Sequence, residues 1–213
     1  MAKKHSELVA KEGWIFLFPF IVLTVLSYFL GWSPILTVIF AILGFYVAWF
    51  FRNPYRQIPA DPNSIVSPAD GKVVGVHRMD DGRQLITIFL NIFNVHVNRC
   101  PIGGTVEHVE HFKGLFLAAY KEEASQLNER NLVILRDGDF RVDVIQIAGL
   151  IARRIICWVS KDQQMARGER FGLIRFGSRM DIILPESCEI LVKTGQKVAG
   201  GCDILATRGR ETA

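Results

Sequence analysis

The residue with the clearest chemical potential is Ser178, which follows Gly177 in RFGSR (175–179) between two apolar runs. A serine hydroxyl is a weak nucleophile at neutral pH and needs a nearby base. Histidine has a suitable pKa, and a carboxylate can fix its tautomer. Candidates stand upstream: His96 in a strand-like run, and Asp70 in SPADG (67–71). Each also has an ordinary structural interpretation. Gly177-Ser178 would be a glycine-containing bend, His96 a half-buried histidine, and Asp70 the acid of an Asx turn.

The other reactive side chains favour neither a metal site nor a disulfide framework. His108 and His111, in EHVEH (107–111), have a spacing seen in metal sites, but no third ligand is indicated, so we predict no metal. The G-x-S-x-G elbow of serine hydrolases is absent. No cysteine pair has CxxC spacing, which argues against zinc and thioredoxin-like motifs; the four are Cys100, Cys157, Cys188 and Cys202.

The elements that must position these residues begin with two uncharged apolar runs, 14–30 and 35–51, joined by the turn GWSP (31–34). They predict a transmembrane helical hairpin over residues 1–52. A signal peptide and a hairpin that enters the bilayer only part-way are the alternatives. Lysines precede the hairpin and Arg52 and Arg56 follow it, whereas the turn has neither Lys nor Arg. The positive-inside rule therefore predicts the inner cell membrane, with the main domain on the cytoplasmic side.

The proline-rich segment 53–63 predicts a linker, and residues 64–213 form the expected main domain. Short apolar runs broken by Gly, Asp and Pro predict strands near 72–76, 85–90, 96–100, 132–135, 142–151, 154–159, 180–184 and 189–192. Helix is expected only near 121–130. The glycine rhythm of residues 192–206 resembles lipoyl-like domains, so we predict a mainly β, barrel-sandwich-like domain. The net charge of +4 is too mild for a nucleic-acid partner and suits anionic lipid.

Four segments together resemble the phosphatidylserine decarboxylase family, in its short bacterial and archaeal form. They are FFRNP (50–54), SPADG (67–71), NVHVNR (94–99) and FGS (176–178), and the likeness extends over roughly residues 47–206. The resemblance implies a proenzyme that cuts its own Gly177–Ser178 bond and converts Ser178 into a pyruvoyl cofactor. Chains 1–177 and 178–213 would then form a heterodimer, with further dimerisation left open.

The resemblance also implies roles for the individual residues. Asp70, His96 and Ser178 match the self-cleavage set, and His96 is a candidate proton donor in turnover. The substrate would be the phospholipid phosphatidylserine and the product phosphatidylethanolamine. Arg99 and Arg179 are candidates to bind the lipid phosphate, and a role as surface charges or in structural ion pairs is an equal alternative.

Two departures from the long-form pattern affect this interpretation. Many long-form relatives have a second histidine three residues after the first, where this chain has Arg99. His96 therefore serves both steps, or His77, His108 or His111 contributes. Leu-Gly-Ser-Thr becomes FGSR here, which keeps the scissile pair.

Other functions were weighed against this one. An archaetidylserine decarboxylase shares the head-group chemistry, so these segments do not separate it from the leading interpretation. A membrane-anchored barrel-sandwich adaptor would explain the anchor and the glycine rhythm, but no sustained heptad is present. A pyruvoyl decarboxylase of small molecules would leave the hairpin unexplained.

Overall fold

The computed structural model describes residues 7–115, 127–149, 154–175 and 178–209. The chain divides into two compact units, Met1–Tyr55 and Arg56–Ala213, here termed the helical unit and the β unit. Gly177 and most of the segment 121–130, where a helix was expected, lie outside the described residues.

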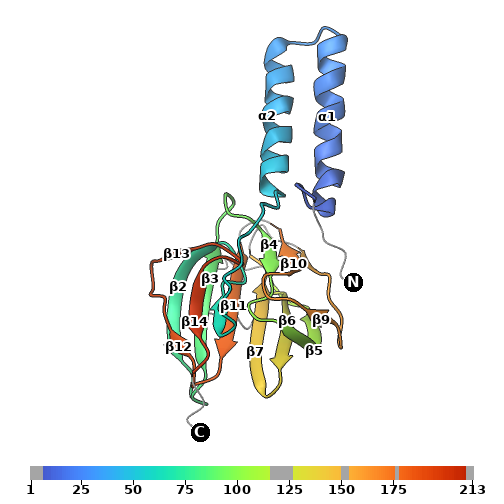
Figure 1. Ribbon diagram of the computed structural model, residues 1–213. Helices are drawn as coiled ribbons and strands as arrows, with labels where there is room; N and C mark the ends of the chain where they lie inside the picture. Colours follow the sequence, from blue (N-terminus) through green and yellow to red (C-terminus); the bar gives the residue numbers. More distant parts are fainter. Residues whose placement is uncertain (1–6, 116–126, 150–153, 176–177, 210–213) are drawn as a thin grey trace. The chain divides into compact units, whose positions relative to one another are not determined.

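The helical unit is a hairpin of two apolar helices (Figure 1). A 3-10 turn, Lys11–Gly13, leads into α1 (Trp14–Phe29), and α2 (Pro34–Phe50) follows the turn at Gly31. The hydroxyls of Ser27 and Thr37 lie 2.6 Å apart and join the two helices. Residues Lys11–Phe29 are long and apolar enough to cross a membrane, and α2 is a shorter apolar helix. The expected N-terminal apolar helix is therefore confirmed.

The β unit is built from one large and two small antiparallel sheets. The large sheet curls into a half-barrel (Figure 1). Its strands, in spatial order, are β13 (Lys197–Val198), β2 (Gly71–Arg78), β3 (Gln84–Leu90), β11 (Ser178–Leu184), β7 (Phe140–Ile147), β6 (Arg130–Asp137), β5 (Gly104–Phe112) and β9 (Gln164–Met165). The small sheets are β4 (Val97–Arg99), β10 (Arg170–Ile174) and β8 (Ile155–Cys157), and β1 (Ser64–Val66), β14 (Ile204–Thr207) and β12 (Glu189–Ile190).

The core lies on one face of the large sheet. Alternate β11 residues Met180, Ile182 and Leu184 are fully buried there and join a cluster that includes Ile86 and Ile88 of β3. This alternation is the period of two that places every second side chain on one face of a strand. The prediction of a mainly β domain is confirmed, and most predicted strands are present.

The register defines two edges of the large sheet. A continuous row of paired residues crosses five strands, through Phe89, Arg179, Ile147, Arg130 and Phe112, and the pair Ser178–Leu90 is the next one along β11 and β3. We call this row the Ser178 edge. At the opposite edge, turns follow β2, β6 and β11. The six residue-to-residue steps from Ser178 to Leu184 separate the two edges by about 20 Å.

Candidate active site

Ser178 is the first residue of β11 and is fully buried. Strand alternation places its side chain on the same face as Met180, which is the core face. Its Oγ atom is buried and has no hydrogen-bond partner among the described residues. Buried hydroxyls are normally satisfied, so an orphaned one at a strand end is typical of a group with a chemical task.

His96 is also fully buried, and its Nδ1 lies 2.9 Å from the carbonyl oxygen of Asn94. A carbonyl accepts only, so in the neutral ring Nδ1 carries the proton and Nε2 is the basic nitrogen. Asn94 belongs to a tight turn in which its side-chain oxygen accepts the N–H of Asn91. The turn therefore fixes the tautomer that a general base requires.

Strand pairing and one backbone hydrogen bond relate His96 to Ser178. On one side Leu90 pairs with Ser178, and the chain reaches His96 six residues later. On the other side the N–H of Ile174 donates to the carbonyl of His96 at 3.3 Å. Ile174 and Ser178 are four residues apart, a span of at most about 14 Å. Both residues of the proposed nucleophile–base pair thus lie at the Ser178 edge.

Asp70 lies just before β2, and its carboxylate is committed to other partners. One terminal nitrogen of Arg56 lies 2.8 Å from each carboxylate oxygen, and the N–H of Gly200 donates to Oδ1 at 2.8 Å. Within the described part of the chain, these hydrogen bonds go to Arg56 and Gly200 and not to His96. The structure therefore gives the orientation of His96 to the Asn94 carbonyl. The role of Asp70 in self-cleavage stays a prediction.

Arg99 joins Arg56 and Asp70 in a buried cluster. Its terminal nitrogen donates to the carbonyl of Gly168 at 3.0 Å, and its stem lies against Gly201. A Cβ at Gly201 would stand 2.8 Å from the Arg99 side chain, and this glycine has a φ of +78°. Burial lowers the pKa of Arg99, the charge of Arg56 lowers it further, and Asp70 opposes both. Two guanidinium groups with one carboxylate make a site that favours a further anion.

Arg179 has a different environment. Its guanidinium holds both oxygens of Asp181 at 2.7 and 2.8 Å and reaches Thr87 at 3.2 Å. Alternation along β11 turns Arg179 and Asp181 to the face opposite that of Ser178. Burial raises the pKa of Asp181, although the hydrogen bonds from Arg179 oppose this. For Arg179 the geometry supports the structural ion pair more than a contact to the lipid phosphate.

A network of buried, hydrogen-bonded amide side chains lies near Ser178. Gln146 of β7 donates to Asn98 at 2.8 Å and accepts from Asn131 at 2.9 Å. Gln146 lies opposite Met180, two residues along β11 from Ser178. The Nδ2 of Asn98 is buried and has no hydrogen-bond partner within the described ranges. A ligand oxygen would satisfy this donor.

Comparisons with known proteins decide the family. The family model for phosphatidylserine decarboxylase matches residues 43–206. The chain belongs to the phosphatidylserine decarboxylase family. A phosphatidylserine decarboxylase proenzyme from Syntrophus aciditrophicus is 43% identical over 211 residues, covering 96% of this chain and 99% of that protein. Similar proenzymes from Symbiobacterium thermophilum and Ralstonia nicotianae are 41% and 42% identical, covering 96% and 93% of this chain and 98% and 95% of theirs.

Members of the phosphatidylserine decarboxylase family are carboxy-lyases made as proenzymes, so the chain is an enzyme. This finding excludes the adaptor alternative. Of the other histidines, His108 and His111 are exposed on β5 and lie near Glu110 and Glu129, at 3.2 and 3.5 Å.

Sequence reasoning missed several residues of this candidate site. Arg56 was read only as a flanking charge of the hairpin, yet it binds Asp70. Asn94 and Asn98 flank His96 within the quoted motif, which was the available signal for them. Nothing in the local sequence of Gln146 indicated its role, because that role depends on the register of β7.

Proposed function

We propose that this chain decarboxylates phosphatidylserine to phosphatidylethanolamine through a pyruvoyl group made from Ser178. The observation that carries the proposal is the buried, orphaned hydroxyl of Ser178 at the motif position of a proenzyme family. The residues present fit this cofactor, because it is made from the chain's own serine and needs no separate binding pocket. Gly177 is proposed as the residue before the cut.

In self-cleavage, the Ser178 hydroxyl attacks the Gly177 carbonyl while His96 Nε2 takes the hydroxyl proton. The peptide C–N bond breaks and an ester links the two chains. Loss of the Ser178 α-proton then breaks the ester C–O bond, which leaves a carboxylate on Gly177 and a dehydroalanine. Water replaces its nitrogen, ammonia departs, and a ketone remains. Asp70 supports the site through Arg56 and Gly200, whose positions it fixes.

In turnover, the pyruvoyl carbonyl supplies an electron sink for the pair released as CO2 departs. His96 returns a proton to the substrate carbon. Arg99, with Arg56 beside it, is the stronger candidate for the lipid phosphate, because two guanidinium groups lie in one cluster and suit phosphate geometry. Asn98 offers its buried amide donor to an oxygen of the head group. Arg179 is assigned to Asp181 instead.

The proposed setting is the inner membrane, with the β unit on the cytoplasmic side. The apolar length of Lys11–Phe29 and the basic residues flanking the hairpin support it. The mature enzyme would be a heterodimer of residues 1–177 and 178–213.

Intact mass under denaturing conditions tests the proposal. We expect two chains, and the smaller should carry a pyruvoyl group in place of its N-terminal serine. Ser178→Ala should remain one uncut, inactive chain, whereas Ser187→Ala, at an exposed turn, should cut and release CO2 from phosphatidylserine normally. A folded parent chain that keeps an ordinary serine at 178 would refute the proposal.

A further inference from the structure

Exposed apolar side chains of the β unit gather at the Ser178 edge. Ile92 and Phe93, on the turn after β3, are 37% and 64% exposed, and Leu115 and Leu127 are 55% and 47% exposed. Leu90, where β3 ends, is the partner of Ser178, and Phe112, where β5 ends, closes the neighbouring row. Of the large apolar side chains that are exposed in the described part of this unit, only Val74 and Leu191 lie elsewhere.

Hydrogen bonds fix the backbone of the two segments that carry these side chains. In the first turn, the side chain of Asn91 accepts the N–H of Phe93 at 2.9 Å, and the N–H of Asn94 donates to the Asn91 carbonyl at 3.1 Å. In the second segment, the N–H of Leu115 donates to the Leu127 carbonyl at 2.7 Å. The apolar tips are therefore fixed by the fold, and exposed apolar groups fixed in this way mark an interaction surface.

Basic side chains accompany these tips. Lys113 and Arg154 are exposed, and the guanidinium of Arg130 lies over the ring of Phe112, 4.5 Å from its centre. Among the described residues of this stretch, Glu110 and Glu129 are acidic, and they lie near His108 and His111. Apolar tips ringed by Lys and Arg match an anionic bilayer, in which acyl chains lie beneath negative head groups.

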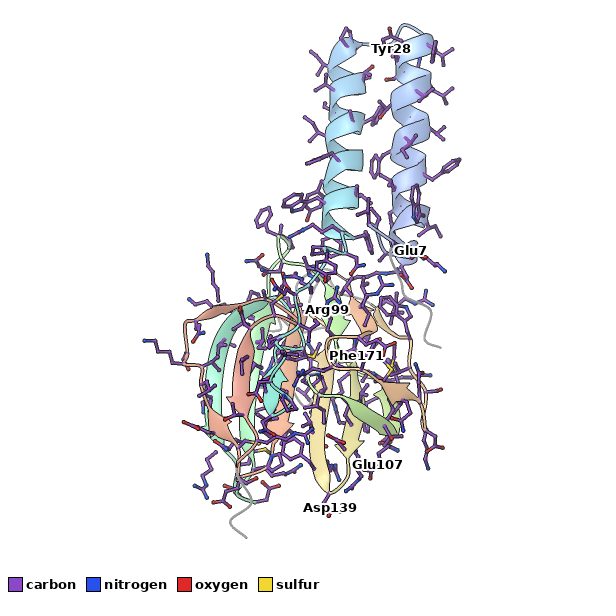
Figure 2. The ribbon with its side chains drawn as sticks, viewed as in Figure 1. Glu7, Tyr28, Arg99, Glu107, Asp139 and Phe171 are labelled. Atoms are coloured by element: carbon purple, nitrogen blue, oxygen red, sulfur yellow. The ribbon has the colours of Figure 1, made fainter. Side chains whose placement is uncertain are left out.

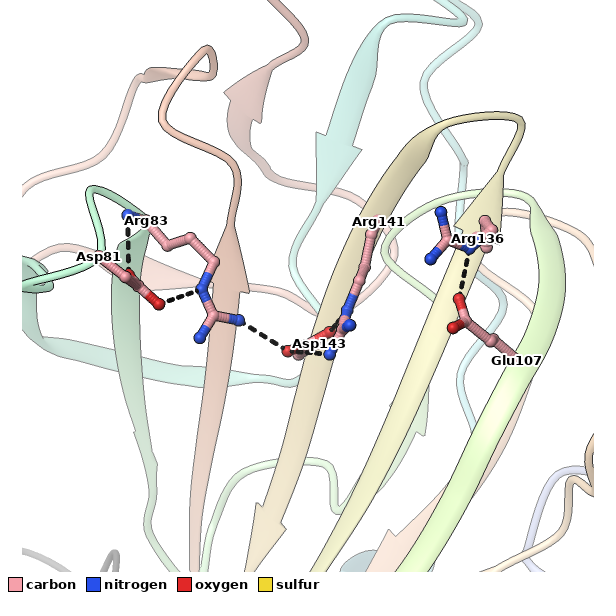
Figure 3. Close-up of polar contacts among 6 residues, drawn as sticks. All are labelled: Asp81, Arg83, Glu107, Arg136, Arg141 and Asp143. Atoms are coloured by element: carbon pink, nitrogen blue, oxygen red, sulfur yellow. Dashed lines mark hydrogen bonds and ion pairs between the residues drawn. The ribbon is translucent and has the colours of Figure 1, made fainter.

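The opposite edge has the reverse character. Its turns carry Asp80, Asp81, Asp139 and Glu186. Its arginines are neutralised by carboxylates: Arg83 and Arg141 both bind Asp143, and Arg136 binds Glu107 (Figure 3). Arg78 binds Glu186. Asp139 and Arg99 lie at opposite ends of the β unit (Figure 2). A surface of this kind is suited to water.

We propose that the Ser178 edge of the β unit is a lipid-docking surface, with Ile92, Phe93, Leu115 and Leu127 entering the head-group region of an anionic bilayer. This inference rests on the proposed function, because a lipid substrate must reach Ser178 from a membrane. The sequence between α2 and the β unit is only residues 51–55, a tether of roughly 20 Å when fully extended. With the apolar helices in a bilayer, this short tether keeps the β unit within reach of the membrane surface.

Depth-dependent quenching tests the surface without any turnover. The full chain is placed in vesicles of brominated phosphatidylcholine and phosphatidylglycerol, in a background whose hairpin tryptophans are changed to Phe, namely Trp14, Trp32 and Trp49. Phe93→Trp should be quenched well beyond the Trp158 background, and Asp139→Trp should not. Equal quenching at the two positions would overturn the proposal.

Turnover gives a second, independent measure. Ile92→Asp with Phe93→Asp should leave self-cleavage intact but lower the conversion of phosphatidylserine in vesicles by about tenfold or more, since two apolar side chains no longer enter lipid. Conversion in detergent micelles should change little. Val74→Asp, at an exposed apolar residue away from this edge, should leave both rates within about twofold. Unchanged vesicle turnover in the double variant would refute docking, whereas an uncut parent would refute the proposed function and leave the quenching result valid.

Discussion

Replacing Arg179 with Met should expose how much the β11 ion pair contributes to folding. The Arg179 and Asp181 side chains are 10% and 4% exposed and share two short hydrogen bonds. Removing one member of such a pair leaves a buried charge, which costs about 3–5 kcal/mol. Arg179→Met with Asp181→Leu should recover most of this loss, because an apolar pair avoids both desolvation costs.

The assay is urea unfolding of the uncut Ser178→Ala chain, in which pulse proteolysis measures the folded fraction of the β unit at each urea concentration. Arg78→Met is the matched control: Arg78 binds Glu186, but both side chains are more than 60% exposed, so the loss should stay below about 1 kcal/mol. Similar losses at the two arginines would refute the argument that burial sets the magnitude.

The deficit of Arg179→Met should shrink as the pH falls. Burial raises the folded-state pKa of Asp181, and loss of Arg179 removes the main opposing interaction. An Asp whose pKa is higher in the folded than in the unfolded state destabilises the fold when the pH is above the folded-state pKa. This penalty disappears as the pH falls towards the unfolded-state pKa of about 4. A stability deficit that is constant from pH 7 to pH 4 would contradict this.

In protein that keeps Ser178 and can cut itself, Arg179→Met with Asp181→Leu should retain both self-cleavage and the KM for lipid. A tenfold rise in KM would restore Arg179 as a phosphate ligand.

Two further predictions concern the site itself. His96→Gln should slow self-cleavage by roughly 10²–10⁴-fold, since it removes the proposed base; intact mass against time measures this, with exposed His77→Gln cutting at the parent rate. If His96→Gln also cuts at the parent rate, another group is the base. Asp70→Asn should lower the stability of the uncut chain by about 1–3 kcal/mol, because Arg56 and Arg99 lose their shared carboxylate. Thermal unfolding checks this, and an unchanged midpoint would show that the cluster is not stabilised by that charge.

The sequence carried the parts of the fold that local patterns determine. Apolar runs such as 85–90 and 180–184 became β3 and β11, because alternation and β-branched residues act within one strand. The strand β5 was missed, since its sequence GTVEHVEHF is polar and only Val106 is fully buried. A strand of this kind is stabilised by its neighbours β6 and β9, which no local pattern records.

The site was predictable only where one motif holds the residue. Ser178 and His96 stand in short segments that the sequence singles out, and their catalytic roles stay predictions. The contact of Arg56 with Asp70 joins a linker residue to a turn 14 positions away, and the contact of Gly200 spans 130 positions. Such pairings depend on the assembled sheets and leave no trace in the spacing of the residues.

Asp70 lies in one electrostatic cluster with Arg99, and its hydrogen bonds go to Arg56 and Gly200. Where long-form relatives have a second histidine, this chain has a buried guanidinium, and Arg56 brings a second one. Two buried cations require a carboxylate more than an imidazole does, since an unpaired buried charge costs far more than a neutral ring. Asp70 is therefore drawn to the arginines, and a backbone carbonyl orients His96 instead. A carbonyl fixes the tautomer of the proposed base without adding a full negative charge beside the ring.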